Sequence, residues 1–427
     1  MNRQSFTTSA LKRCLSQSDK HSLANMGSRS CVDSLINDAI KIADENFRSG
    51  ISVNKIFVKG NCVYSSSCLK EKLILRHCNS NLKTVRSLLP KQRNNIISEL
   101  KIYLKEGTVY RVYRLDIKSF FESIDLQVLL NKLHNEQSIS MHTKNLIEWY
   151  LKGCERIHSS SGLPRGLEIS PILSELYLSN FDKVINRHPN VIYYSRFVDD
   201  MIIISDGCED DGEFIKEVQG VLPNGLRLNK NKLSISPLIP KRSCGDKASR
   251  GDKLIYEFDF LGYAFSIVDH YLEKAGAAQR VYRTVRVELS KKRIKKIKTR
   301  VAKAFYSYHK NGDFKLLLDR ISFLTSNRDL SRKIKASDSA GKSKISTGVY
   351  YSNSMIDGGT KSLEELDDFL IFCVKSNRGR FGKINFRAIT INQKKEILRN
   401  SFKKGFLSRV YRAYNFNRYV EITKIWL

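Results

Sequence analysis

The chain has 427 residues, of which 41% are hydrophobic and 27% are charged. Its length predicts two or three lobes with separate cores, and its ordinary composition excludes a wholly disordered chain. Lys and Arg number 74 against 43 Asp and Glu, which gives a net charge of +31. Because so large a surplus repels itself unless a polyanion neutralises it, nucleic acid is the expected partner, and a merely basic protein is the alternative.

Cysteine spacing and hydropathy narrow the class further. The nine cysteines include no Cys-x-x-Cys pair, and none lies near a His pair with zinc-ligand spacing. We therefore predict no metal–thiolate site and expect reduced thiols. No stretch approaches the roughly 18 uninterrupted apolar residues of a membrane helix. A cytoplasmic protein without a membrane partner is expected.

Residues 1–270 divide into two predicted segments. Residues 1–50 carry apolar residues at helical spacing up to Gly50 and predict a helical N-terminal extension. In residues 51–270, short β-branched runs alternate with helical ones. Strands are expected in VYRVYRLDI, VIYYSRF, MIIIS and IYEFDFLGYAF, and helices in RNNIISELKIYL and ISPILSELYLSNF. The polar, basic stretch 240–253 is expected to be a surface loop.

In the remainder, residues 271–427, strand signals fade after about Ala278 and basic helical patterning follows. In SKKRIKKIKTRVAKAF the apolar positions Ile294, Ile297 and Val301 fall on one helical face, with basic residues around the rest. A linker-like stretch, 331–360, precedes renewed helical spacing over 391–416. The pattern favours an α/β lobe followed by a smaller helical lobe.

Three aspartates lie next to strand-like runs. Asp199 and Asp200 separate the runs VIYYSRF and MIIIS, which predicts a β-hairpin with both aspartates at its turn, and Asp116 ends another strand pattern. Each alone has an ordinary explanation as a turn or helix-capping residue. Together they suit phosphoryl transfer, in which two divalent cations are held by few carboxylates on rigid strand ends.

Five segments in a fixed order resemble the conserved motifs of reverse transcriptases. DIKSFFESID resembles motif A of the palm, SGLPRGLEISPILSELYLSNFD resembles motif B with Arg165 in place of the usual Gln, and SRFVDD resembles the Tyr-x-Asp-Asp box with Phe197 in place of Tyr. NGLRLNKNKLSI is similar to motif D, and FDFLGYAF is similar to motif E, the primer grip. The five segments cover the middle third of the chain.

The resemblance implies an α+β fold of the right-hand polymerase type. Fingers and palm, built from an antiparallel sheet plus helices, are expected over 51–270, with a basic helical thumb and C-terminal extension over 271–427. The implied reaction is RNA-directed DNA synthesis, in which dNTPs are added to a 3′-hydroxyl with two Mg²⁺ ions, or with Mn²⁺ in their place.

The run FFESID and the long basic thumb most resemble bacterial defence-associated reverse transcriptases of the abortive-infection and unknown-group type, relatives of the retron and group II intron enzymes. This implies a non-coding RNA template, a DNA product, antiphage defence, and a second copy or a second defence protein as partner. Three alternatives stay open: a template-independent or protein-primed DNA polymerase, a group II intron or retron enzyme, and an inactive nucleic-acid-binding scaffold.

The resemblance also assigns roles at the active site. Asp116, Asp199 and Asp200 would hold the metals, with Ile117 beside them in the metal and nucleotide site, and Lys232 would protonate the leaving pyrophosphate. Phe121 would be the steric gate against a ribose 2′-hydroxyl, although core packing beside Phe120 is its alternative. The incoming nucleotide would further be bordered by Arg86, Arg93, Arg165, Gly166 and Phe197.

Nucleic-acid contacts are expected outside this centre. Gly262 belongs to the segment that resembles the primer grip. The basic helix at 290–305 is expected to follow duplex phosphates through Lys292, Lys295, Lys296 and Arg300. A membrane-surface helix or an ordinary charged face are the alternatives for that segment.

Overall fold

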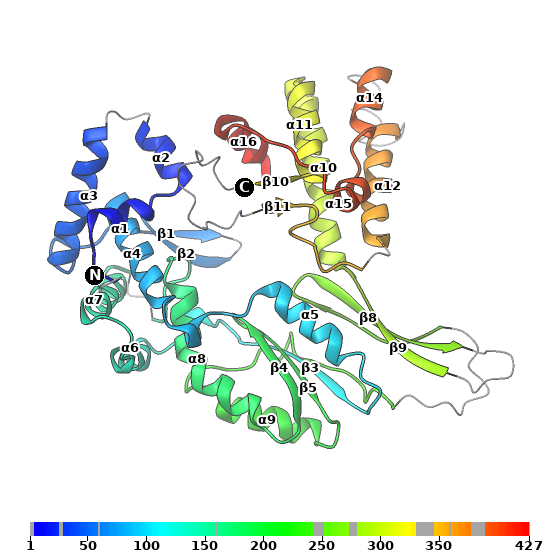
Figure 1. The fold of residues 1–427 in the computed structure, drawn as a ribbon, viewed down its shortest axis with the longest axis horizontal. Coiled ribbons are helices and arrows are strands. Elements are labelled where there is room, and N and C mark those ends of the chain that lie inside the picture. The colour runs from blue at the N-terminus through cyan, green and yellow to red at the C-terminus, as the bar shows by residue number, and fades with distance from the viewer. Residues whose placement is uncertain are drawn as a thin grey trace. The chain divides into compact units, whose positions relative to one another are not determined.

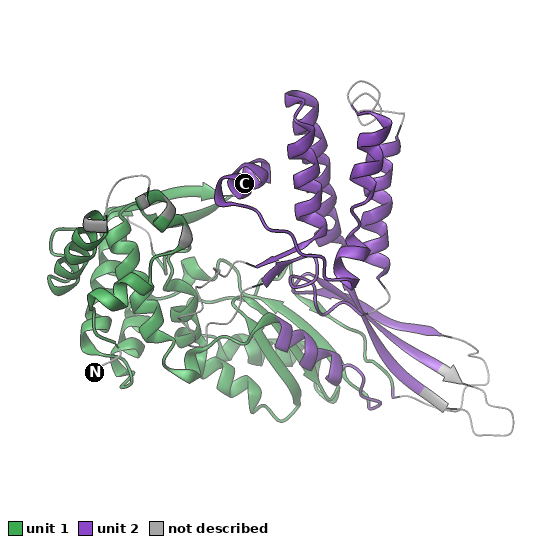
Figure 2. Cartoon of the chain, turned by 45° about the horizontal axis from the view of Figure 1, so that its top comes forward, with its two compact units in different colours: residues 1–93, 109–240 green, residues 94–108, 241–427 purple. Residues whose placement is uncertain are grey.

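The computed structural model describes residues 4–24, 29–58, 60–158, 161–241, 252–272, 280–329, 346–357, 360–376 and 389–426 (Figure 1). The chain divides into two compact units (Figure 2). The first consists of residues 1–93 and 109–240, and the second of residues 94–108 and 241–427. Within the described residues, no helix is both long and apolar enough to span a bilayer.

Helices dominate the N-terminal part of the first unit, as the periodicity predicted. They are α1 (Thr8–Arg13), α2 (Gln17–Ala24) and α3 (Arg29–Asp44). The buried face of α3, with Ile36, Ala39 and Ala43, belongs to the main hydrophobic core. Helix α3 packs on α4 (Leu69–Leu82).

A hairpin of β1 (Val53–Val58) and β2 (Asn61–Ser66) precedes α4. The buried carboxylate of Glu71 on α4 accepts hydrogen bonds from the Ser52 backbone N–H at 2.8 Å, from the Ser66 hydroxyl at 2.9 Å and from the Tyr150 hydroxyl at 3.3 Å. These bonds satisfy a buried charge and fix the hairpin to the helices. The remaining helices of this region are η1 (Arg86–Leu88), η2 (Phe121–Ser123), α6 (Leu126–Asn135) and α7 (Met141–His158).

The centre of the first unit is a four-stranded antiparallel sheet with the order β4-β5-β3-β6. Its strands are β3 (Arg111–Asp116), β4 (Val191–Phe197), β5 (Asp200–Ser205) and β6 (Ser234–Ile235). Tyr113, Ile203 and Tyr194 form one cross-strand row. Phe181 of α8 (Ser170–Asn186) lies 6.3 Å from the Tyr194 ring, and Phe214 of α9 (Asp211–Val221) lies 4.9 Å from the Tyr113 ring. Both helices therefore cover the same face of the sheet.

The second unit contains α5 (Arg93–Tyr103) and a three-stranded antiparallel sheet. The strands are β7 (Lys253–Phe260), β8 (Tyr263–Leu272) and β9 (Arg280–Leu289). Strand β9 corrects the expectation that strand signals fade after about Ala278. Its buried residues Val285, Val287 and Leu289 alternate with polar ones, which is the period of a half-buried strand.

Helices and two short strands complete the second unit. The elements are α10 (Lys291–Asn311), α11 (Phe314–Thr325), β10 (Asn327–Asp329), β11 (Ser346–Gly348), α12 (Lys361–Lys375), α14 (Ile391–Leu398), α15 (Phe402–Leu407), α16 (Phe416–Thr423) and η3 (Lys424–Trp426). The stretch 391–416, expected to be helical, forms two separate short helices and only the first residue of α16. Most of the expected loop 240–253 and much of the linker 331–360 lie outside the described residues. The prediction of an α+β fold, with helices and antiparallel sheets, is confirmed.

Candidate active site

Sheet register brings the three predicted aspartates together. Asp116 is the last residue of β3 and pairs directly with Asp200, the first residue of β5. The backbone N–H of Ile117 donates to the carbonyl oxygen of Asp199 at 3.2 Å. The hairpin was predicted with both aspartates at its turn. The structure puts only Asp199 in the turn, beside Val198, whereas Asp200 already belongs to the strand.

Asp116 is buried and held by the loop that resembles motif D. Its Oδ1 lies 2.7 Å from the Lys232 ammonium, and its Oδ2 accepts a hydrogen bond from the Asn229 side chain at 2.9 Å. The Asn229 backbone N–H also donates to the Asp116 carbonyl at 2.7 Å. Asn229 was not predicted as a site residue, although it lies in the same motif as Lys232. Together these contacts fix the orientation of the Asp116 carboxylate.

Burial and mutual repulsion shape the charge of this centre. Burial raises the pKa of Asp199. Burial, with added repulsion from Asp199 and Asp116, raises the pKa of Asp200 to about 6. The hydrogen bond to Asp116 raises the pKa of Lys232, which keeps its ammonium protonated. Carboxylates that repel one another in a partly buried place are stabilised by a nearby cation, and in this structure Lys232 supplies that positive charge.

The carboxylates of this centre can be compared with the ligands that a divalent ion requires. Among the residues that the structure describes, no three Asp, Glu, His or Cys side chains are gathered closely enough to form a metal site by themselves. Mg²⁺, however, is typically held by one or two carboxylates and completes its shell with water and substrate phosphate oxygens. The Asp116 and Asp200 pair, with Asp199 next to it, fits an ion of that kind.

The turn between β4 and β5 has a strained backbone. Val198 adopts φ 62°, in the left-handed region, which is unfavourable for a β-branched residue and is the place where two-residue hairpins usually carry Gly. Its carbonyl oxygen accepts a hydrogen bond from Arg196 Nη1 at 2.9 Å. Strain of this kind persists only where surrounding contacts hold it, and Arg196 provides such a contact beside Asp199.

Arg196 is itself held by two carboxylates of α8. Its side chain is 3% exposed, and it donates to Asp182 at 2.9 and 2.6 Å and to Glu175 at 3.2 and 2.8 Å. Tyr194 also donates to Asp182 at 2.6 Å. The guanidinium thus connects α8 to the turn that carries Asp199. The sequence reasoning assigned no role to these residues, because their pairing depends on contacts between separate elements.

Phe121, the predicted gate, lies beneath Arg165. The ring is 9% exposed, and its centroid lies 5.3 Å from that of Phe120, so part of it packs in the core. The Arg165 guanidinium lies 5.2 Å from the ring centroid. It forms a bidentate ion pair with Glu122, from Nε to Oε1 at 3.2 Å and from Nη2 to Oε2 at 3.3 Å. The side chain that replaces the usual Gln therefore covers the predicted gate.

Two glycines allow the motif B loop to approach its neighbours. A Cβ on Gly162, which has φ 90°, would meet the Glu122 carbonyl oxygen at 2.5 Å, and Leu163 N–H donates to the Phe121 carbonyl at 2.7 Å. A Cβ on Gly166, which has φ 103°, would meet the Tyr64 carbonyl oxygen at 2.7 Å. Only Gly tolerates both the conformation and the close contact. The loop is thus fixed to the backbone of the gate and to β2.

The other predicted site residues lie as follows. Phe197 is half-buried at the end of β4, Arg86 is exposed in η1, and Arg93 is half-buried at the start of α5. Gly262 has φ 79° in the turn between β7 and β8 of the second unit. Lys292, Lys295 and Lys296 are exposed on α10, whereas Arg300 stacks on Trp426 with 5.8 Å to the ring centroid. Their proposed substrate and nucleic-acid contacts stay predictions.

An antiparallel sheet that presents paired aspartates at a hairpin turn, covered by helices on one face, defines a polymerase palm of the nucleotidyltransferase class. Residues 64–265, slightly less than half of the chain, match the family model of reverse transcriptase (RNA-dependent DNA polymerase). This match indicates an RNA-directed DNA polymerase, which is a nucleotidyltransferase. No curated protein matches the chain.

Solved structures with some similarity include two yeast telomerases. The apo telomerase from Candida tropicalis truncated from its C-terminal domain has 14% identity and a TM-score of 0.33, over 55% of this chain and 59% of that chain. The Candida albicans telomerase in complex with a fragment of telomeric RNA has 12% identity and a TM-score of 0.35, over 88% of this chain and 61% of that chain. The match spans less than two thirds of either telomerase, and at these TM-scores the likeness says nothing about activity.

Proposed function

We propose that the chain is an RNA-directed DNA polymerase that adds deoxynucleotides to a 3′-hydroxyl and releases pyrophosphate. The observation that carries the proposal is the cross-strand pair of Asp116 and Asp200, with Asp199 in the adjoining turn. This pair lies within the segment that matches the reverse transcriptase family. Two divalent ions, Mg²⁺ or Mn²⁺, would be held by these carboxylates together with substrate phosphates.

Each side chain of the centre has a defined task in the proposed reaction. When bound, the ions activate the attacking hydroxyl and stabilise the leaving oxygen. Asp116 is oriented for this by Asn229, and Asp199 by the turn that Arg196 holds. Lys232 keeps a proton on Nζ 2.7 Å from Asp116, and it donates that proton to the leaving pyrophosphate. Phe121 narrows the space beside the sugar and favours a deoxyribose.

The test is nucleotide incorporation by Asp199→Asn and Asp200→Asn, alone and together, on an RNA template with a DNA primer. Asn keeps the size of each side chain and removes its charge, so the fold should survive while incorporation falls about a thousandfold or more, the effect of losing ~4 kcal/mol of transition-state stabilisation. The matched control is Asp211→Asn, which removes an exposed carboxylate on α9. Undiminished metal-dependent incorporation by the double variant would refute the assignment.

A dedicated non-coding RNA template and a role in antiphage defence form a finer part of the proposal. Their support is the resemblance of FFESID and the basic C-terminal region to bacterial defence-associated reverse transcriptases. Sequencing the nucleic acid that copurifies with the chain tests the template. A single defined RNA supports a templated reaction, whereas DNA attached covalently to the protein indicates protein priming, and an absence of any synthesis indicates an inactive scaffold.

A further inference from the structure

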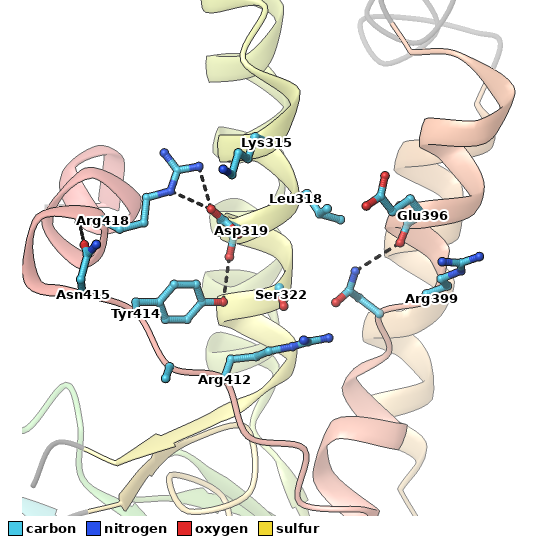
Figure 3. Close-up of a pocket in the computed structure, with 12 residues that line it drawn as sticks. Lys315, Leu318, Asp319, Ser322, Glu396, Arg399, Arg412, Tyr414, Asn415 and Arg418 are labelled. Carbon is cyan, nitrogen blue, oxygen red and sulfur yellow. Dashed lines mark hydrogen bonds and ion pairs between the residues drawn. The ribbon is translucent and has the colours of Figure 1, made fainter. Parts of the chain in front are cut away.

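A pocket of about 710 Å³ lies entirely within the second unit (Figure 3). Its walls come from α11, from α14 with the residues that follow it, and from the segment that leads into α16. This volume lies within the range of sites that bind small ligands or single nucleotides. None of its residues belongs to the carboxylate centre described above.

Positive side chains outnumber negative ones around this pocket. Lys315, Arg399 and Arg412 line it and are all exposed. In the described part of the chain, their side chains make no hydrogen bond or ion pair. Glu396 is the one acidic lining residue whose carboxylate is not paired with a described residue. The surplus favours an anionic ligand, and three long side chains from separate elements can reach its charges from different sides.

A second set of contacts makes the wall rigid. Arg418 donates from Nε to Asp319 at 2.7 Å and from Nη1 to Glu421 at 2.6 Å, so the two carboxylates neutralise its positive charge and leave one negative charge in excess. The Tyr414 hydroxyl donates to the Asp319 carbonyl at 3.3 Å. Figure 3 shows the contacts of Arg418 and Tyr414 with Asp319 on one wall. Because the paired charges are committed to the fold, the three unpaired cations remain for a ligand.

Amide groups add polar recognition beside the cations. Asn415 accepts a hydrogen bond from the Arg418 backbone N–H through Oδ1 at 2.8 Å, so the amide NH₂ group is left as a donor. Asn400 donates to the Ile397 carbonyl at 3.1 Å, which leaves its Oδ1 as an acceptor. Such groups suit base edges or a ribose 2′-hydroxyl, which single-stranded RNA exposes.

We propose that this pocket binds a short single-stranded RNA segment, with Lys315, Arg399 and Arg412 contacting its phosphates. Concavity favours a single strand, because unpaired nucleotides can enter a pocket of this size, whereas a duplex offers a broad, stiff surface. The choice of RNA over DNA rests on the proposed function. The binding of a phosphodiester strand does not, because it follows from the charge and shape of the pocket.

The experiment compares Arg399→Gln/Arg412→Gln with a matched control, Lys395→Gln/Lys404→Gln, in the full chain. The control removes two exposed positive charges from α14 and α15 outside the pocket. Affinity for a fluorescent twelve-nucleotide oligouridine is measured over a range of salt concentrations, with EDTA and without dNTPs. Since catalysis is absent, the result is independent of whether the chain polymerises DNA. Thermal unfolding midpoints verify that both double variants are folded.

The pocket variant should bind the oligonucleotide tenfold or more weakly, because each charge-assisted hydrogen bond to a phosphate contributes substantially. The log–log slope of affinity against salt should flatten by about 1.4, which is about 0.7 for each single-strand phosphate that the variant no longer neutralises. The control should change neither quantity beyond the general effect of charge. Equal weakening in both variants, equal weakening for a blunt RNA duplex, or displacement of the oligonucleotide by uridine monophosphate at the same molar concentration would each overturn the proposal.

Discussion

Replacing Arg196 with Lys should lower polymerase activity through the strained turn at Val198, and replacing Val198 with Gly should restore it. Arg196 makes five hydrogen bonds, four to Asp182 and Glu175 and one to the Val198 carbonyl. Lys keeps the charge, which matters because removing it would leave the half-buried carboxylates of Asp182 and Glu175 without their cation. Its compact ammonium cannot make all five bonds at once.

The magnitude follows from two opposing terms. A hydrogen bond from a charged donor contributes about 1.5–3 kcal/mol, and a strained left-handed residue costs about 1–3 kcal/mol. Because the terms are comparable, loss of the bond should let the turn relax and displace Asp199. We expect kcat/KM to fall about ten- to a hundredfold, with more divalent metal needed for half-maximal rate.

Val198→Gly isolates the cause, because Gly adopts positive φ without the penalty that Val bears at φ 62°. Alone it should change the rate little, and in the Arg196→Lys background it should recover about tenfold. The assay is primer extension at several metal concentrations, combined into a double-mutant cycle. Arg283→Lys is the matched control, since it alters another buried Arg that is bound to Asp269 at 2.7 Å in the second unit. Simple additivity of the two substitutions would refute the reasoning about strain.

Three further outcomes are expected. Lys232→Gln should reduce kcat by about a hundredfold or more, as loss of a general acid does. The same variant should bind divalent metal more tightly, because the ammonium no longer occupies Asp116, and weaker metal affinity would contradict this. Phe121→Val should reduce the preference for dNTPs over rNTPs, measured as a ratio of kcat/KM values, whereas Phe120→Val should affect only stability; an unchanged ratio in folded Phe121→Val would place the gate elsewhere. Charge reversal on α10 uses the substitutions Lys292→Glu, Lys295→Glu and Lys296→Glu. It should flatten the salt dependence of duplex binding about equally for different sequences. An unchanged slope would show that the helix is only a solvated face.

Local patterns sufficed for the central sheet and its aspartates. The runs that became β3, β4 and β5 are rich in β-branched and aromatic residues, so their period and composition agree with the final structure. Asp116 and the Asp199–Asp200 pair follow or interrupt those runs, which made their meeting at one edge of the sheet predictable. Strand β9 was missed because its three Arg residues, one of which is buried on the apolar face (Arg283), resembled the basic helix that follows.

The contacts that hold the site could not be predicted in the same way. Arg196 bonds to two carboxylates on α8 and to a carbonyl in its own hairpin, and no spacing rule joins those partners. The strain at Val198 could not be predicted from the sequence either, because two-residue hairpin turns usually contain Gly or Asn and this turn contains neither. The ion pair between Arg165 and Glu122 spans 43 positions of the chain, so it too emerges only from the fold.

Helix α5 has a consequence for how the chain can be synthesised and divided. Residues 94–108 belong to the second unit although both flanking segments belong to the first. Lys101 on α5 pairs with Asp357, 256 positions later, and Asn94 bonds Ser354 at 3.1 Å. During synthesis on the ribosome, these partners of α5 are added only after most of the chain has been made. Contacts between residues so distant in sequence slow folding. A fragment that stops at residue 240 would keep α5 without these partners, so it should be less stable and aggregate more readily than the intact protein.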